Sequence, residues 1–287
     1  MVGYGLNAEI GKKFIDYLYG KEKLMGVTKN RTLNKIGLEK YNNQGYLMKI
    51  IQYEKFDNML IEFQDDHKAT IKTCWSNFSK GNIRNPYAPT VCGVGITGNK
   101  YPTSICGKTI KEYMTWRDML RRCYRKQTKE KQPTYKDVTC CEEWLWYENF
   151  YEWLHSQENF DKWLNGEKWT LDKDIICKGN KMYCPEKCCL VHNNINVLFT
   201  KDNAKRGMLP IGVIKNPRQD NFIARCANGE NKNIYLGTFY NAQEAFYAYK
   251  EAKEKIIKET AKEEYKKGNI VKKCYEAMMC YEVEITD

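Results

Sequence analysis

The residues best suited to chemistry lie between positions 172 and 196. Asp172 and Lys173 end a short segment of alternating apolar residues, and His192, Asn193 and Asn196 follow a later apolar run. Carboxylate and amide oxygens are the ligands that hard divalent cations prefer, and a bound cation can stabilise the charge on a scissile phosphate. Asp172, Asn193 and Asn196 are therefore candidate ligands for Mg²⁺ or Mn²⁺. His192 is the nearby imidazole that could move a proton.

The chain also contains 13 cysteines, several of them close to these residues. Four thiolates can hold a structural Zn²⁺ ion, with two to four residues between paired ligands. No pair of C-x-x-C knuckles is present, and cysteine is also a small apolar residue that is commonly buried for packing. Zinc ligands and buried thiols therefore both remain as interpretations. The zinc candidates are Cys177, Cys184, Cys188 and Cys189, with the pair Cys140 and Cys141 nearby.

The segments around the chemical residues predict two strands and a short helix. Residues 169–176 alternate as a strand does, and turn-forming residues at 178–181 separate them from a second short run at 182–183. Residues 185–191 then lead into the asparagine-containing segment, which we expect to be helical. A hairpin followed by a helix is the ββα-metal arrangement, which would bring Asp172 and Asn196 to one cation.

A basic and aromatic helix is expected over residues 111–126. Apolar residues recur at three- and four-residue steps, and arginines occupy another side. Residues 100–132 carry 10 basic and 3 acidic side chains, a net charge of +7. This density is typical of a phosphate-binding surface, and a solvated helix face is the alternative. The candidate DNA contacts here are Arg117, Arg121, Arg122 and Arg125.

A second helix, over residues 142–155, is rich in aromatic residues. We interpret these rings as core packing rather than as a surface that stacks on bases.

At these positions the chain resembles the HNH-type endonuclease-like proteins of bacteriophages. The phrases that carry the resemblance are residues 116–124, Trp144 with Asn149 and Phe150, and residues 171–175, 179–181 and 195–196. The resemblance implies that the aspartate before a central histidine binds the metal, that the histidine activates water and that a helix residue completes the coordination. By position, Asp172 matches the metal-binding aspartate, and Asn196 or Asn193 matches the helix ligand.

Lys173 stands where that family has its central histidine. A lysine ammonium is protonated at neutral pH and is a poor general base. The catalytic candidates are therefore Asp172, Lys173 and, as a substitute base, His192. The motif predicts the ancestry of this module better than its activity.

Residues 206–260 predict a three-stranded antiparallel sheet followed by a helix. Three short apolar runs are separated by polar turns, and Asn241 with Glu244 forms a capping box that opens the helix. The runs resemble the AP2-type DNA-binding domain of plant regulators and phage endonucleases. The matching phrases are residues 212–213, 222–224, 235–239 and 244–249. The resemblance implies a sheet that enters the major groove, with contacts from Lys215, Arg218, Arg225, Lys232 and Tyr235.

The whole chain has 287 residues, 42% of them hydrophobic, and a net charge of +11, which favours a polyanionic partner. We expect an α+β fold in three modules: residues 1–90, mostly β; residues 91–205, the HNH-like module; and residues 206–287, the AP2-like module with a helical tail. No apolar run reaches the ~18 residues of a membrane span. The first 20 residues lack the pattern of a secretion signal.

These patterns and resemblances predict a protein that binds double-stranded DNA and nicks or cleaves it with Mg²⁺ or Mn²⁺, in the cytoplasm of an infected bacterial host. A structural Zn²⁺ and a homo-oligomer are further expectations. The alternative is a catalytically inactive viral protein that binds and inhibits a host defence nuclease complex through protein–protein contacts. A regulator that binds DNA without cleaving it lies between the two.

Overall fold

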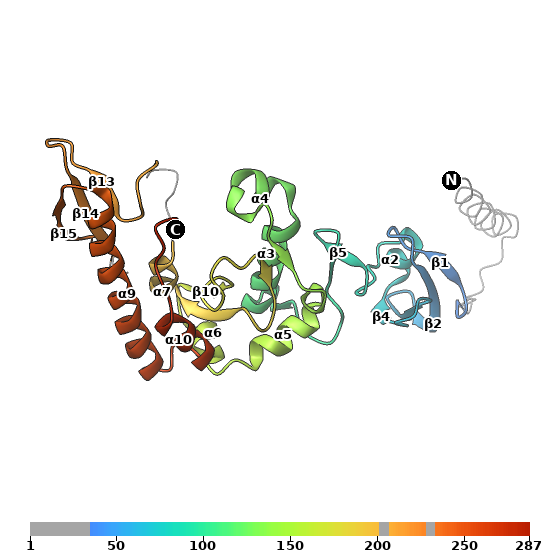
Figure 1. The fold of residues 1–287 in the computed structure, drawn as a ribbon. Coiled ribbons are helices and arrows are strands. Elements are labelled where there is room, and N and C mark those ends of the chain that lie inside the picture. The colour runs from blue at the N-terminus through green and yellow to red at the C-terminus, as the bar shows by residue number, and fades with distance from the viewer. Residues whose placement is uncertain (1–34, 201–206, 228–232) are drawn as a thin grey trace, which may run out of the picture. The chain divides into compact units, whose positions relative to one another are not determined.

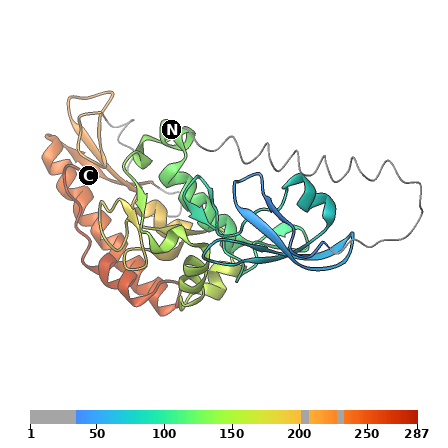
Figure 2. The same cartoon turned by 90° about the vertical axis from the view of Figure 1, so that its right-hand side faces the viewer.

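The computed structural model describes residues 35–200, 207–227 and 233–287, and it divides the chain into two compact units, residues 1–85 and 86–287. Both contain helices and sheets, so the fold is α+β (Figures 1 and 2). The predicted first boundary near position 90 falls just after the division between Asn85 and Pro86. Lys232 lies outside the described residues.

The described part of the first unit, residues 35–85, contains a four-stranded antiparallel meander and one short helix. Its elements are β1 (Glu39–Tyr41), β2 (Leu47–Lys55), β3 (Asn58–Phe63), β4 (Thr70–Thr73) and α2 (Trp75–Lys80). Alternate residues of β2 and β3 are buried, and they form the core with Phe78 of α2. The antiparallel pairing of β2 with β3 confirms the hairpin that the two apolar runs predict.

The second unit begins with two small hairpins and a helical layer. Its first elements are β5 (Pro89–Val91), β6 (Gly95–Ile96), β7 (Ser104–Ile105), β8 (Lys108–Thr109), α3 (Lys111–Tyr124), α4 (Lys126–Lys131) and the 3₁₀ turn η1 (Pro133–Tyr135). There follow β9 (Thr139–Cys140), the 3₁₀ turn η2 (Glu143–Leu145), α5 (Tyr147–His155) and α6 (Phe160–Asn165). The predicted helix over 142–155 is therefore the turn η2 and then α5.

The aromatic residues of α3 and α5 form the largest core of this unit. Trp116, Trp144 and Phe150 are fully buried in it, and the indole N–H of Trp116 donates to the carbonyl oxygen of Trp144 at 2.8 Å. The interpretation of the rings in residues 142–155 as core is confirmed for Trp144 and Phe150.

The chemical segment contains β10 (Trp169–Asp172), β11 (Met182–Tyr183), β12 (Cys189–His192) and α7 (Asn193–Leu198). The predicted hairpin between residues 169–176 and 182–183 is wrong. β11 pairs in parallel with β9, and β10 pairs antiparallel with β12. The strand also ends at Asp172, because its carboxylate then accepts hydrogen bonds from the chain that turns away.

The C-terminal part contains β13 (Val213–Lys215), β14 (Phe222–Ala227), β15 (Asn233–Phe239), α9 (Ala242–Lys266) and α10 (Lys272–Met279). The three strands form an antiparallel sheet in chain order, and α9 packs on one face of it (Figures 1 and 2). The side chain of Asn241 accepts from the backbone N–H of Glu244 at 2.8 Å, which confirms the predicted N-cap.

The second half of α9 and α10 pack on the strands and helix of the chemical segment. The shared core contains Cys189, Ile195, Ile257, Ala261, Cys274 and Met278. This core joins the chemical segment to α9 and α10 within the compact unit of residues 86–287. Among the described helices, none has the length and apolarity that a bilayer span requires.

Candidate functional site

Asp172 is 9% exposed at the end of β10. Its Oδ1 atom accepts hydrogen bonds from the backbone N–H groups of Asp174 and Ile175, both at 2.8 Å. Burial raises the pKa of this carboxyl, although the two N–H groups act in the opposite direction. The carboxylate therefore closes the turn after β10, as an Asx turn does.

Lys173 is buried beside it. Its ammonium donates to the two carboxylate oxygens of Asp174 at 2.6 and 2.7 Å, and to the carbonyl oxygen of Asn180 at 3.0 Å. The Asn180 side chain donates in return to the carbonyl oxygens of Lys173 and Met182. The residue in the position of the family's histidine thus joins the two ends of the loop 173–180, and sequence reasoning missed Asn180 as its partner.

His192, Asn193 and Asn196 lie at the start and middle of α7. The Nδ1 atom of His192 lies 2.7 Å from the amide oxygen of Asn194, and its ring caps the helix. In the β10–β12 ladder His192 faces Trp169, whereas Asp172 faces Cys189. Three residue steps, about 10 Å, therefore separate Asp172 from His192 along the ladder.

The described hydrogen bonds of the Asp172 side chain are with its own turn. Oδ1 of Asp172 already has two backbone donors, and the hydrogen bonds between described residues include none from Asp172 to Asn193 or Asn196. Within the described ranges, no three His, Cys, Asp or Glu side chains are placed to hold a metal.

The cysteines are free thiols, and the four predicted zinc ligands lie in three different locations. The parallel pairing of β9 with β11 places Cys141 beside Tyr183, so that Cys140 and Cys141 lie near Cys184 and Cys188. Cys189 instead shares a thiol hydrogen bond with Cys274 of α10, and burial together with this bond raises its pKa. Cys177 is exposed. The four predicted zinc ligands therefore divide between these locations.

The four arginines of α3 and its C-terminal end are not equivalent. The Arg122 guanidinium donates to the Tyr183 hydroxyl at 3.3 Å and lies 5.8 Å from the ring centroid of Tyr135. Arg117 and Arg121 flank Asp118 at 3.5 and 3.0 Å. Arg125 is exposed between α3 and α4. Arg121 and Arg125 therefore present charge to solvent, whereas Arg122 packs against Tyr183 and Tyr135.

The C-terminal sheet presents a polar face away from α9. Ala224 and Cys226 of β14 are buried against the helix, so Arg225 between them points to the opposite face. Arg225 pairs in register with Tyr235 of β15, whose side chain is 60% exposed. The Tyr235 hydroxyl lies 2.7 Å from the hydroxyl of Thr238. This open sheet face therefore combines a cation, a phenol and a hydroxyl.

The other predicted contacts of this module lie at its edge. Lys215 forms an ion pair with Asp220, and its ammonium lies 4.6 Å from the Phe222 ring centroid. Arg218 is exposed in the β13–β14 turn. Of the described candidates, Arg225 and Tyr235 are those that strand pairing brings together.

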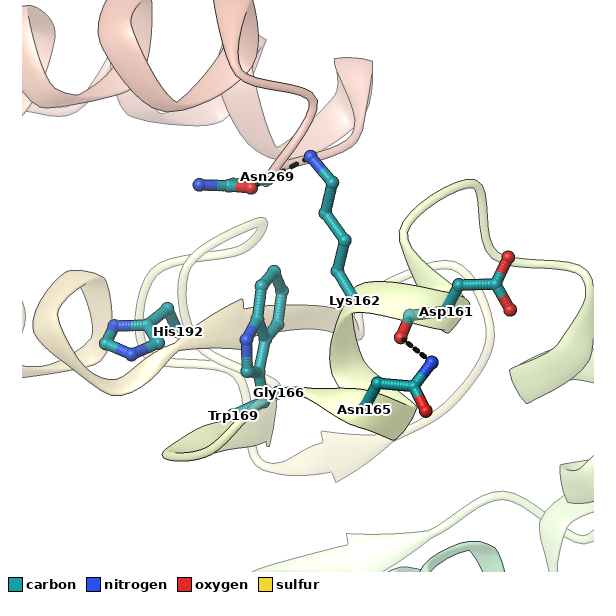
Figure 3. A pocket seen from close by; sticks show the side chains of 7 residues that line it. All are labelled: Asp161, Lys162, Asn165, Gly166, Trp169, His192 and Asn269. Carbon is teal, nitrogen blue, oxygen red and sulfur yellow. Dashed lines mark hydrogen bonds between the residues drawn. The ribbon is translucent and has the colours of Figure 1, made fainter.

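A cavity of about 570 Å³ lies beside Trp169 and was not predicted from the sequence (Figure 3). Its lining residues are Asp161, Lys162, Asn165, Gly166, Trp169, His192 and Asn269. They come from α6, from facing ends of β10 and β12 and from the α9–α10 connection. The sequence signal for it is weak, since only Trp169 and His192 are chemically distinctive and they are far apart in the chain.

Comparison with known proteins finds no matching family model, no similar curated protein and no similar solved structure.

Proposed function

We propose that the chain binds double-stranded DNA through the open face of the β13–β15 sheet and does not cleave it. The observation that carries the proposal is the exposed pair Arg225 and Tyr235, in register on the face opposite α9. Antiparallel strands can enter a DNA groove, and arginine can bind either a phosphate or a guanine edge.

The basic surface of the helical layer supports the same partner. Arg121 and Arg125 lie at the end of α3, and Lys126 and Lys131 follow on exposed positions of α4. Exposed cations of this kind bind phosphates by releasing counterions, without reading sequence. The sheet face would supply orientation, and this surface would supply affinity.

The absence of cleavage is proposed from the chemistry and positions of three side chains. Lys173 is held as an ammonium between Asp174 and Asn180, so it is unsuited to deprotonate water. Asp172 is committed through Oδ1 to its own turn, and His192 lies at the other end of the ladder. The groups that a nuclease would need together are thus separated.

The test is a DNA titration by fluorescence anisotropy at several salt concentrations. Arg225→Ala is expected to weaken binding about ten-fold and to reduce the salt slope by about one. Lys262→Ala is the matched control, since it removes the same charge from an exposed position of α9. Equal binding by Arg225→Ala and the unchanged protein contradicts the proposal.

Plasmid nicking with Mg²⁺ or Mn²⁺ tests the second half of the proposal, that the protein does not cleave DNA. We expect no nicking, and nicking that Asp172→Asn removes would overturn this half alone. Stoichiometric capture of a host protein, with negligible affinity for DNA at low salt, would overturn the first half in favour of an inhibitor of a host defence complex.

A further inference from the structure

We infer that the cavity beside Trp169 binds a planar nucleobase, which stacks on the indole. The cavity is open to solvent, and its volume of about 570 Å³ is large enough for a base, since small-molecule sites occupy ~300–1,000 Å³. The base would come from an unpaired nucleotide of the bound DNA, and in this respect the inference rests on the proposed function. A free nucleotide offers the same ring and is a separate arm of the test.

The apolar wall of the cavity is Trp169. Its indole is partly exposed and packs from behind against the aromatic core. Gly166 lies at its edge, where a Cβ atom would come within 2.5 Å of the indole Nε1. The glycine therefore leaves room for the ring in its present position. His192 stands almost perpendicular to the indole, at 83° and 6.1 Å between ring centroids, so it bounds the wall without covering it.

The polar rim is held in place by the protein. Asn165 donates through its amide nitrogen to the carbonyl oxygen of Asp161 at 2.9 Å, and Lys162 donates to the amide oxygen of Asn269 at 3.0 Å (Figure 3). Buried Asn159 donates to the carbonyl oxygens of Leu190 and Asn269, both at 2.9 Å, which ties the α9–α10 connection to β12. The rim therefore needs little reorganisation to receive a ligand.

The groups left available match the edge of a base. Nδ1 of His192 is engaged by Asn194, at 2.7 Å from its amide oxygen and 3.4 Å from its backbone nitrogen, so Nε2 is the ring nitrogen that this contact leaves available. No hydrogen bond between described residues uses Nε1 of Trp169 or the amide oxygen of Asn165. The cavity thus offers the Trp169 N–H as a donor, the Asn165 oxygen as an acceptor and the His192 Nε2 atom around an aromatic plane.

A phosphate is a poorer fit, because Lys162 is already bonded to Asn269 and to the carbonyl oxygen of Lys267, while Asp161 adds a negative charge. A carbohydrate ring also stacks on indoles, so the experiment below includes a sugar ligand. The basic surface of the same unit favours the nucleobase, since it would hold the strand from which the base comes.

The test compares two duplexes that carry 2-aminopurine, one with the base paired and one with it unpaired in a bulge. We expect binding to the bulged duplex to be about ten-fold tighter, with quenching of 2-aminopurine fluorescence by stacking. Trp169→Ala is expected to remove the preference and the quenching, and Trp169→Phe to retain most of both. Trp153→Ala is the control, since that ring is partly buried but does not line the cavity.

Asn165→Ala removes an exposed rim group and keeps the inference testable if Trp169→Ala does not fold. We expect it to reduce the preference by about three-fold, as the loss of one hydrogen bond does. Equal affinity for the two duplexes, or unchanged 2-aminopurine fluorescence, overturns the inference. Quenching of Trp169 by an N-acetylglucosamine oligomer and not by adenosine monophosphate overturns it in favour of a sugar site.

The two proposals fail in different ways. If the unchanged protein does not bind DNA, the proposed function is contradicted. If adenosine monophosphate nevertheless quenches the tryptophan fluorescence of the unchanged protein but not that of Trp169→Phe, the nucleobase site in the cavity is supported. Arg225→Ala is expected to weaken binding to both duplexes by the same factor, because that residue lies on the sheet and not in the cavity.

Discussion

The loop after β10 and the open face of the β13–β15 sheet both contain polar side chains. Two of those in the loop are buried, whereas two of those on the sheet are exposed. In the loop, Asp172 and Lys173 are buried and bonded to the chain around them. On the sheet, Arg225 and Tyr235 project from a strand pair whose other face is covered by α9. The loop contains the stronger sequence motif, and the sheet contains the groups that a partner can reach.

The difference shows that side chains suited to chemistry can instead serve the fold. The Asp172 carboxylate and the Lys173 ammonium satisfy buried polar groups, which would otherwise cost free energy on folding. Side chains used in this way are unavailable to a substrate. The comparison therefore predicts large stability effects in the loop and binding effects on the sheet.

The largest expected effect is on the support of the sheet face, at Gly212. It has φ of +77°, and a Cβ atom there would lie 2.0 Å from Cδ2 of Tyr249 on α9. Gly212→Ala is expected to destabilise residues 86–287 by about 3 kcal/mol, from backbone strain and the clash together. Urea unfolding followed by circular dichroism measures the change.

Gly207→Ala separates the two causes. Gly207 also has positive φ, at +66°, but no atom of the described residues lies within 4 Å of its Cβ position. Only the backbone cost of about 1 kcal/mol is expected there. Equal destabilisation by the two variants would show that the packing of Tyr249 under β13 contributes nothing.

The second effect tests whether Asp172 is a structural acceptor. Asp172→Ala leaves two backbone N–H groups without partners, one of them on buried Ile175. Each unsatisfied buried donor costs about 1–3 kcal/mol, so we expect a loss of about 2–3 kcal/mol in the free energy of unfolding. Chemical denaturation at neutral pH is the measurement.

Asp172→Asn is the matched control because it keeps an oxygen acceptor in the same place. Its expected loss is below about 1 kcal/mol. If Asp172→Ala unfolded at the same urea concentration as the unchanged protein, the carboxylate would be free for another role. The contrast between the loop and the sheet would then break down.

Local features of the fold could be predicted from the sequence. The spacing of apolar residues predicts α3, the capping box predicts the start of α9, and two apolar runs predict the β2–β3 hairpin. Strand partners could not be predicted in the same way. Residues 182–183 and 189–192 are both short apolar runs after β10, and local pattern does not decide which of them pairs with it.

The types of the candidate site residues could be predicted from the sequence. Which of these side chains are exposed to solvent could not. Arg122 and Arg125 belong to one basic segment, yet Arg122 is covered by Tyr183, 61 residues away in the chain. Likewise, the sequence places Lys173 between Asp172 and Asp174, but its bond to Asn180 depends on the closed loop. Long-range packing decides which of these charges solvent can reach.

The smallest expected effect is the pH dependence of stability that Asp172 contributes. Burial raises its pKa in the folded protein above that of the unfolded chain, so the folded state holds the proton more strongly between the two values. Stability then falls as pH rises from the unfolded through the folded pKa, and stays lower above it. The fall is about 1.4 kcal/mol for each unit between the two values. Asp172→Asn does not titrate, so the unfolding free energy of the unchanged protein minus that of the variant, measured by urea denaturation from acid to neutral pH, is expected to decrease across this window. An increase with pH would mean that the two N–H groups of the turn outweigh burial, and the carboxylate would then stabilise the loop through its charge as well as its shape.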